Sequence, residues 1–128
     1  MNKLIIDVAN EKFFLMIITS ANIYNITHEN TKINYERLTL IINDFLSSKN
    51  LKIAEINTIY INNRTRSFAG IRNLMSIVKA FNVAKNIDYY CYNLDDFKDE
   101  KDLNYENIPD LCEKYKVKKN LINPIYIS

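Results

Sequence analysis

Three apolar runs near the N-terminus predict an antiparallel sheet. Residues 3–8 are typical of a buried strand, and residues 13–20 form a second strand that is apolar on both faces. A third strand is expected over residues 23–27. Only a few residues separate the three runs, and links this short join antiparallel neighbours. The beginning of the chain is therefore predicted to form a meander.

Two segments with helical periodicity follow this meander. Residues 35–48 place one apolar stripe at helical spacing, and Asn34 is the expected N-cap. Leu40 falls on the opposite side of that helix, roughly 200° from Leu38. In residues 71–85 the apolar positions spread over more than half of the circumference, whereas packing on one face needs only about 100°. We therefore expect another buried face on the second helix, against the first helix, a partner chain, or both.

The remaining elements define the fold class. Strands are predicted at residues 58–62 and 87–92, and a short helix at residues 109–115 with Pro109 in its first turn. Three antiparallel strands, a helix, a parallel strand, a helix and a further strand is the order of a ribonuclease-H-like core. We therefore predict an α/β fold with a mixed five-stranded sheet, of the type found in the N-terminal domain of actin-like ATPases.

Composition narrows the class of protein. The chain has 128 residues, of which 48% are hydrophobic, and its net charge of +2 is too small to indicate nucleic-acid binding by itself. The longest apolar run, residues 13–18, is too short to span a membrane, and Asp7 and Asn10 interrupt any secretory signal. Cys91 and Cys112 form no CxxC pair. We expect a soluble, cytoplasmic protein with ordinary thiols.

Gly70 is the only glycine in the chain. It lies in the segment Ser67-Phe68-Ala69-Gly70-Ile71-Arg72, at the start of the second predicted helix. Since no other glycine is retained, this position is expected to need a residue without Cβ. Two reasons would explain that need: an unusual φ, or close contact between the start of the helix and another backbone.

Residues 56–94 resemble the signature of the TsaB (YeaZ-type) family of bacterial tRNA threonylcarbamoyladenosine biosynthesis proteins. That signature is a strand, a Gly-Pro-Gly-Ser-Phe-Thr-Gly-x-Arg segment, and a helix with a Lys or Gln near its middle. The chain departs from it at residues 64–66, where Arg-Thr-Arg replaces Gly-Pro-Gly, and at Ala69, which replaces Thr. The positions that match are Ser67, Phe68, Gly70, Arg72 and Lys79.

Both ends of the chain add to this resemblance. The opening Leu4-Ile5-Ile6-Asp7 is similar to the family's Ile-Asp-Thr-Ser, and residues 123–127 resemble its terminal Pro-x-Tyr-Leu. Most of the family's second domain is missing. The resemblance therefore implies a TsaB-like, ribonuclease-H-like N-terminal domain over residues 1–97, followed by a remnant of the second domain and a C-terminal tail over residues 98–128.

Asp7 is the strongest candidate for a catalytic or metal-binding residue. It ends the first predicted strand, where this superfold holds a metal ion or orients a nucleotide. A Mg²⁺-dependent nuclease needs several carboxylates around its ions, and no convincing second or third carboxylate is found. The turn after Asp7 has no glycine to cradle phosphate, and His28, the only histidine, lies in a polar loop. We predict no catalytic residue, cofactor or metal ion. Asp7 then either hydrogen-bonds nearby backbone or is a relic of an ancestral site.

The resemblance implies a non-catalytic subunit that binds and stabilises the catalytic TsaD-type subunit, which modifies the adenosine beside the tRNA anticodon. In that family the N-terminal helices of the two proteins associate as a bundle. The predicted contact residues are Leu40, Leu74, Ile77, Ala80, Phe81 and Ala84. Packing of all six within the domain is the alternative. Other implied partners are a TsaE-type ATPase, a second copy of the chain when it is alone, and tRNA only indirectly or weakly.

Two other functions remain open from the sequence. One is a small Mg²⁺-dependent nuclease of ribonuclease-H-like fold that uses Asp7, and the other is a homodimeric relic without a pathway role. The basic residues Arg64, Arg66, Arg72 and Lys79 cluster near the start of the second helix. Such a cluster can contact tRNA phosphates, a carboxylate on a partner, or solvent alone.

Overall fold

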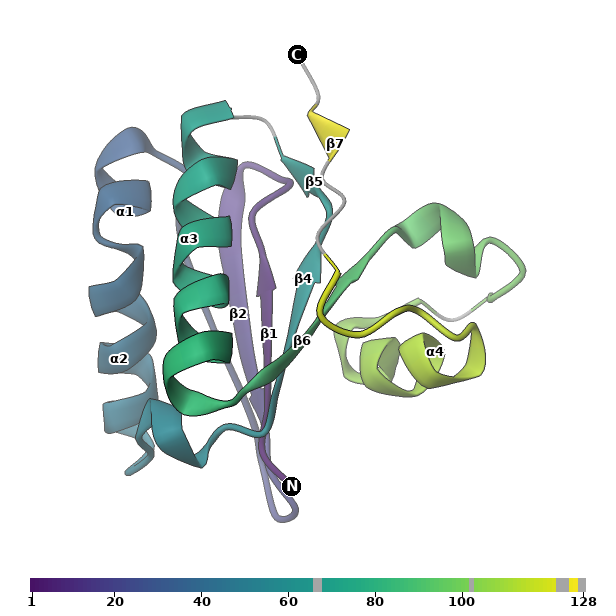
Figure 1. Cartoon of the computed structure of the whole chain (residues 1–128), viewed down its shortest axis with the longest axis horizontal. Helices are drawn as coiled ribbons and strands as arrows, with labels where there is room; N and C mark the ends of the chain where they lie inside the picture. The colour runs from purple at the N-terminus through teal and green to yellow at the C-terminus, as the bar shows by residue number, and fades with distance from the viewer. Residues whose placement is uncertain (66–67, 102, 122–124, 127–128) are drawn as a thin grey trace.

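The sheet at the centre of the protein has five strands in mixed orientation (Figure 1). A computed structural model describes residues 1–65, 68–101, 103–121 and 125–126. The strands are β1 (Lys3–Asp7), β2 (Lys12–Ile18), β3 (Ile23–Glu29), β4 (Thr58–Asn62) and β6 (Asp88–Tyr92), and their order across the sheet is β3-β2-β1-β4-β6. The pairs β1–β2 and β2–β3 are antiparallel, whereas β1–β4 and β4–β6 are parallel. The predicted mixed α/β sheet is confirmed.

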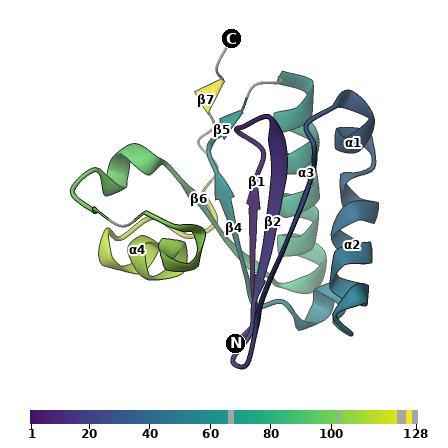
Figure 2. The same cartoon turned by 180° about the vertical axis from the view of Figure 1, so that it is seen from behind.

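Helices cover both faces of this sheet. The helices α1 (Lys32–Glu36), α2 (Leu38–Ser48) and α3 (Phe68–Lys85) lie on one face, and α4 (Ile108–Lys114) lies on the other (Figures 1 and 2). The short 3-10 helices are η1 (Ile53–Glu55), η2 (Leu94–Phe97) and η3 (Tyr105–Asn107). A second, two-stranded sheet pairs β5 (Arg64–Thr65) in parallel with β7 (Ile125–Tyr126). Within these described residues, no helix has both the length and the apolar character that crossing a membrane requires.

The larger hydrophobic core lies between the sheet and the helices α2 and α3. Side chains alternate between the two faces of a strand, so every second residue of β1 and β2 points into this layer. Its fully buried members come from strands and helices alike: Leu4, Ile6, Leu15, Ile17, Leu38, Ile42, Leu74 and Val78. The apolar stripes predicted for the two helices therefore do cover this face of the sheet.

The smaller hydrophobic core lies on the other face, beneath α4 and η2. Ile5, Tyr60 and Tyr92 of the sheet pack here against side chains from the last third of the chain. Those side chains are Phe97, Ile108, Leu111 and Cys112, and each of them is buried. Residues before and after position 97 thus share one core, so both faces of the sheet are covered by this chain itself.

The first helical segment starts earlier than predicted and is interrupted. Thr31, not Asn34, is the N-cap, because its side-chain oxygen accepts a hydrogen bond from the N–H of Asn34 at 3.2 Å. The side chain of Asn34 instead donates to the carbonyl oxygen of Glu29. A break at Arg37 separates α1 from α2, so the single helix expected over residues 35–48 is wrong.

In the described part of the chain, three of the four residues with a left-handed backbone are asparagines, and the fourth is Lys116 after α4. Asn50 follows α2 with φ of 58°, and Asn86 follows α3 with φ of 56°. After α2, the N–H of Leu51 donates to the carbonyl oxygen of Leu46 at 2.9 Å, which satisfies a group that the helix end leaves open. Helix termination therefore does not explain the one glycine that the chain retains.

Candidate functional site

Gly70 is buried near the start of α3, directly against the ring of Tyr35. Its φ is not positive, so an unusual backbone conformation is not the reason for a glycine here. A Cβ at this position would lie 2.3 Å from both Cε1 and Cζ of Tyr35. The expected need for a residue without Cβ is confirmed. The close contact, however, is with an aromatic side chain and not with another backbone.

Tyr35 joins α1 to the sheet and to α3. Its side chain is 5% exposed, and its ring meets the ring of Phe13 edge to face, with the centroids 4.6 Å apart. The side-chain amide of Asn73 in α3 donates to the carbonyl oxygen of Tyr35. Gly70 and Tyr35 therefore fix how α1 and α3 pack side by side on the sheet.

Asp7 forms a buried hydrogen-bond network at the end of β1. It is 3% exposed, and its Oδ1 accepts the N–H of Ala9 at 2.9 Å. Its Oδ2 accepts the hydroxyl of Tyr105 at 2.9 Å and the side-chain amide of Asn62 at 3.3 Å. Hydrogen bonding of Asp7 to nearby backbone, as expected from the sequence, is therefore observed, together with partners from β4 and η3.

The phenols around Asp7 stay protonated at neutral pH. Burial raises the pKa of Tyr105, and the charge of Asp7 and its hydrogen bond raise it further, whereas a hydrogen bond with Asn10 acts the other way. Burial also raises the pKa of Tyr92 well above its usual value, with Asp7 as the next cause. The Tyr92 hydroxyl is buried and has no hydrogen-bond partner among the described residues. Asp7 is thus surrounded by neutral hydrogen-bond donors.

Two solved structures from Pseudomonas aeruginosa match this architecture. One is YeaZ, and the other is an uncharacterized protein with similarity to peptidase YeaZ. Each aligns with 72% of this chain and 43% of its own length, at 14% identity and a TM-score of 0.64. The fold is that of YeaZ. This chain spans less than half of the YeaZ chain. No protein-family model and no curated protein matches the sequence at a significant level.

A third structural neighbour is a protein with a bound DNA substrate. T. thermophilus RuvC in complex with a Holliday junction substrate aligns with 77% of this chain and 68% of its own length, at 10% identity and a TM-score of 0.51. The likeness to YeaZ and to RuvC confirms the predicted ribonuclease-H-like architecture. The sequence left open a Mg²⁺-dependent nuclease that uses Asp7, so the side chains around Asp7 decide how well a divalent ion fits.

The residues at the metal-binding edge of the fold do not fit a divalent ion. Ligands in open α/β sheets bind beyond the carboxyl ends of the parallel strands, here β1, β4 and β6. The side chains at those ends are Asp7, Asn62, Asn63, Tyr92 and Asn93, so only one is a carboxylate. Among the described residues, no three His, Cys, Asp or Glu side chains come together. A nuclease would need further carboxylates to hold its ions.

The YeaZ-type motif is described only in part. Ser67 and Arg66 lie outside the described residues, and Phe68 begins α3. Arg72 and Lys79 are exposed on α3. The guanidinium of Arg64 forms an ion pair with Asp95 at 2.8 Å. The predicted basic cluster is therefore partly neutralised within the chain.

The predicted contact residues divide into buried and exposed groups. Leu74 is 0% exposed and belongs to the larger core, so its prediction as a partner contact is wrong: the position that faces the sheet cannot also face a partner. Ile77 and Phe81 are half-buried and pack against the same core. Leu40 is 48% exposed, and Ala80 and Ala84 are exposed.

Two further apolar residues on these helices are exposed and were missed from the sequence. Val83 on α3 is 85% exposed, and Ile33 on α1 is 65% exposed. Val83 follows Ala80 by three residues, and this spacing alone places both on one side of the helix. We call the exposed apolar side chains of the helical layer the outer helical surface. It comprises Ile33, Leu40, Ala80, Val83 and Ala84.

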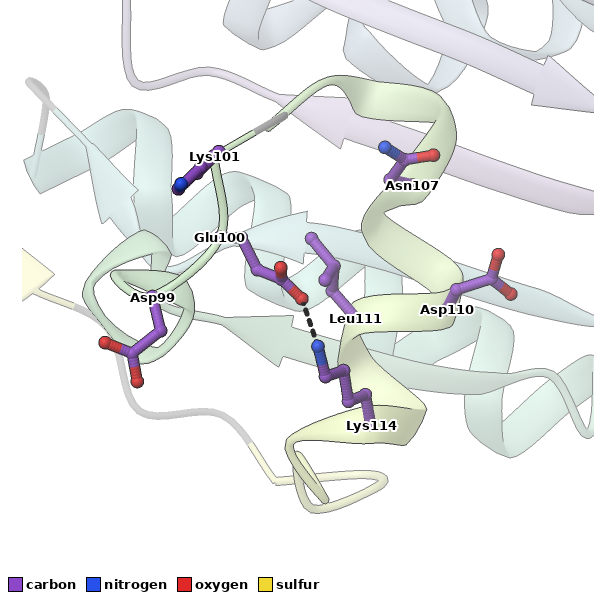
Figure 3. Close-up of a pocket in the computed structure, with 7 residues that line it drawn as sticks. All are labelled: Asp99, Glu100, Lys101, Asn107, Asp110, Leu111 and Lys114. Atoms are coloured by element: carbon purple, nitrogen blue, oxygen red, sulfur yellow. Dashed lines mark hydrogen bonds and ion pairs between the residues drawn. The ribbon is translucent and has the colours of Figure 1, made fainter.

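A hollow of about 490 Å³ on the opposite face has no features of a reaction site. It lies between α4 and the segment after η2, and its lining is largely charged (Figure 3). The ammonium of Lys114 and the carboxylate of Glu100 pair across it at 2.7 Å. Leu111 is buried, whereas each polar or charged side chain of the described lining is exposed or half-buried. We interpret it as a solvated edge of the second layer.

We expect Cys112 to be inert in the folded protein. Burial raises the pKa of its thiol from 9.0 to about 12, so almost no thiolate forms at pH 8. Iodoacetamide should therefore alkylate the half-buried Cys91 well before Cys112. In the denatured chain, where both thiols are exposed, the two rates should be similar. Preferential labelling of native Cys112 would contradict this.

The same shift predicts the direction of a pH effect on stability. Above pH 9 the unfolded Cys112 loses its proton while the folded one keeps it. The free energy of unfolding should therefore fall as the pH rises from 9 towards 12, and less so in Cys112→Ala. Urea denaturation at several alkaline pH values measures this difference.

Proposed function

We propose that this chain is a non-catalytic, TsaB-like subunit of the tRNA threonylcarbamoyladenosine modification machinery. It binds and stabilises a TsaD-type catalytic subunit, which acts on the adenosine beside the anticodon. The observation that carries the proposal is the YeaZ fold of a chain whose Gly70 segment also resembles the YeaZ-type motif. The chain contributes a binding surface and no reacting group.

The outer helical surface supports this role. α2 and α3 lie on one face of the sheet (Figure 1). Their buried residues belong to the larger core, so their exposed residues lie on the side away from the sheet. Ala80 and Ala84 are one turn apart, and such small side chains allow another helix to approach closely. Burial of Val83 and Leu40 against a partner would remove apolar surface from water, which favours association.

The donor set at Asp7 argues against the nuclease alternative. The carboxylate is enclosed by Tyr105, Asn62 and Ala9, and the described lining of the hollow beside it contains no second carboxylate. The proposed subunit therefore leaves chemistry to its partner. The same surface can pair two copies of this chain when the partner is absent, and contact with a TsaE-type ATPase or with tRNA is made through the assembled complex.

Charged substitutions on the outer helical surface test this function. Ala80→Glu and Val83→Glu each place a carboxylate where the partner helix would pack, and an unpaired buried charge is costly. We expect co-purification with the TsaD-type subunit to be lost, or affinity to fall by roughly tenfold or more. Isothermal titration of the two purified proteins measures the change.

Ala21→Glu is the matched control, because Ala21 is also exposed but lies between β2 and β3. It should bind the TsaD-type subunit as well as the wild-type chain does. Circular dichroism should give the same thermal midpoint for all of the variants. If the wild-type chain and the TsaD-type subunit do not associate at micromolar concentrations, or if both Ala80→Glu and Val83→Glu leave binding intact, the proposed function is wrong.

A further inference from the structure

Tyr105 connects the segment between β6 and α4 to Asp7. Its hydroxyl donates to Oδ2 of Asp7 across 98 positions of sequence, from η3 to the end of β1. Its ring stacks on Phe14 of β2, with the centroids 3.9 Å apart and the planes 15° from parallel. Asn10, in the turn after β1, lines the same hollow as Tyr105. Both the ring and the hydroxyl of Tyr105 are therefore held by the N-terminal hairpin.

Apart from the contacts of Tyr105, the layer that contains this residue is held against the sheet mainly by apolar contacts. Phe97 and Ile108 lie on either side of it in sequence and are 0% and 2% exposed in the smaller core. Lys114 pairs with Glu100 and Asp95 pairs with Arg64 at the surface of this layer, and exposed ion pairs contribute little to stability. The hydrogen bond to Asp7 is a half-buried link to a carboxylate, and such bonds are stronger than those between neutral groups.

A hollow of about 410 Å³ adjoins this link. Asp7 and Tyr105 line it together with two amides, Asn10 and Asn104, and with the apolar side chains of Leu94, Leu103 and Ile108. An ion that entered here would have to compete for Asp7 with three hydrogen-bond donors already in place. An ionised carboxylate offers about four acceptor positions, so at most one remains. The hollow has no second carboxylate in its described lining.

We infer that the Asp7–Tyr105 hydrogen bond is a clasp that holds residues 94–117 over the second face of the sheet. A nuclease of this fold would bind an ion at the position of Asp7. Here the carboxylate at that position hydrogen-bonds Tyr105, which lies in the last third of the same chain. This goes beyond the proposed function, because it states what holds the segment after β6 against the sheet. It also leaves the outer helical surface as the place for a partner.

Tyr105→Phe tests the clasp without removing the ring. The Phe14 stacking remains, and only the hydroxyl that bonds Asp7 is lost. Removing a hydrogen bond to a charged group shifts an opening equilibrium by roughly tenfold or more. Amide hydrogen exchange in residues 94–117 should accelerate by that factor, while exchange in β1 and α3 changes less. Tyr115→Phe is the matched control, since Tyr115 is a half-buried tyrosine of the same layer that packs on Phe97.

A second variant and a metal probe complete the experiment. In Asp7→Asn the effect of Tyr105→Phe should shrink, because the two groups act on each other. Titration of the wild-type chain with MnCl2, followed by paramagnetic broadening of NMR signals, should leave residues 7–10 unaffected at millimolar concentration. The inference is overturned if Tyr105→Phe and Tyr115→Phe give the same exchange rates, or if Mn²⁺ binds at Asp7. Neither readout involves the TsaD-type subunit, so this inference and the proposed function fail separately.

Discussion

Gly70→Ala should lower the free energy of unfolding by about 1–3 kcal/mol, although alanine is the better helix former. In an exposed helix the same substitution would be favourable by up to about 1 kcal/mol. The opposite sign is expected here because the new methyl would stand 2.3 Å from ring atoms of Tyr35, and the packed ring has little room to move. Urea denaturation gives the sign and the size of the change.

The clash should disappear when the ring is removed. Leucine has no Cε or Cζ atoms, so in a Tyr35→Leu background the substitution of Gly70 by Ala should become neutral or stabilising. Ser76→Ala, at an exposed position of the same helix, should change stability by no more than about 0.5 kcal/mol. A stabilising effect of Gly70→Ala in the otherwise wild-type chain would mean that Tyr35 does not pack as described.

Phe97→Ala should be the most damaging single truncation in the second layer. Phe97 is 0% exposed and lies beside both Tyr92 and Tyr115, with centroids 6.1 and 5.5 Å away. Truncating a buried phenylalanine removes its transfer free energy and leaves a cavity, which costs about 3–5 kcal/mol. We expect a lower urea midpoint and a single unfolding transition, because both layers share the sheet.

Leu94→Ala is the control for this truncation. Leu94 belongs to the same 3-10 helix but is 38% exposed, so it should cost clearly less than the substitution at Phe97. If Phe97→Ala unfolds in two separate transitions, or costs no more than Leu94→Ala, residues 94–117 do not share a cooperative core with the sheet.

Local patterns were sufficient for much of the fold. The strand at residues 58–62 is observed with the predicted limits, and Pro109 lies in the first turn of α4 as expected. The start of the first helix was placed wrongly because Thr31 and Asn34 are both good capping residues, and only the backbone at Thr31 decides between them. The helical periodicity of the apolar residues also predicted too many outward-facing residues on α3. Periodicity shows which residues share a face of a helix, but it does not distinguish a wide buried face from a docking surface.

The candidate site was predictable only where one residue is informative by itself. Because Gly70 is the only glycine, the sequence indicated that this position needs a residue without Cβ. No local feature of the sequence identified Tyr35 as the residue whose ring occupies the place of that Cβ. Likewise, the end of a buried strand identified Asp7, whereas Tyr105 lies far along the chain in a polar segment. Val83 was overlooked because an apolar residue near a helix end carries no signal for exposure.

By itself the sequence determined the order of strands and helices, the sheet with mixed pairing, and the position that must be glycine, because these depend on periodicity and on the chemistry of single residues. The tertiary structure alone decided that Tyr35 contacts Gly70, that Tyr105 hydrogen-bonds Asp7, and that the last third of the chain covers the second face of the sheet. These contacts join residues separated by tens of positions. Whether these contacts form depends on how whole layers pack against one another. A local pattern of apolar and polar residues does not specify which residues far apart in the sequence come into contact.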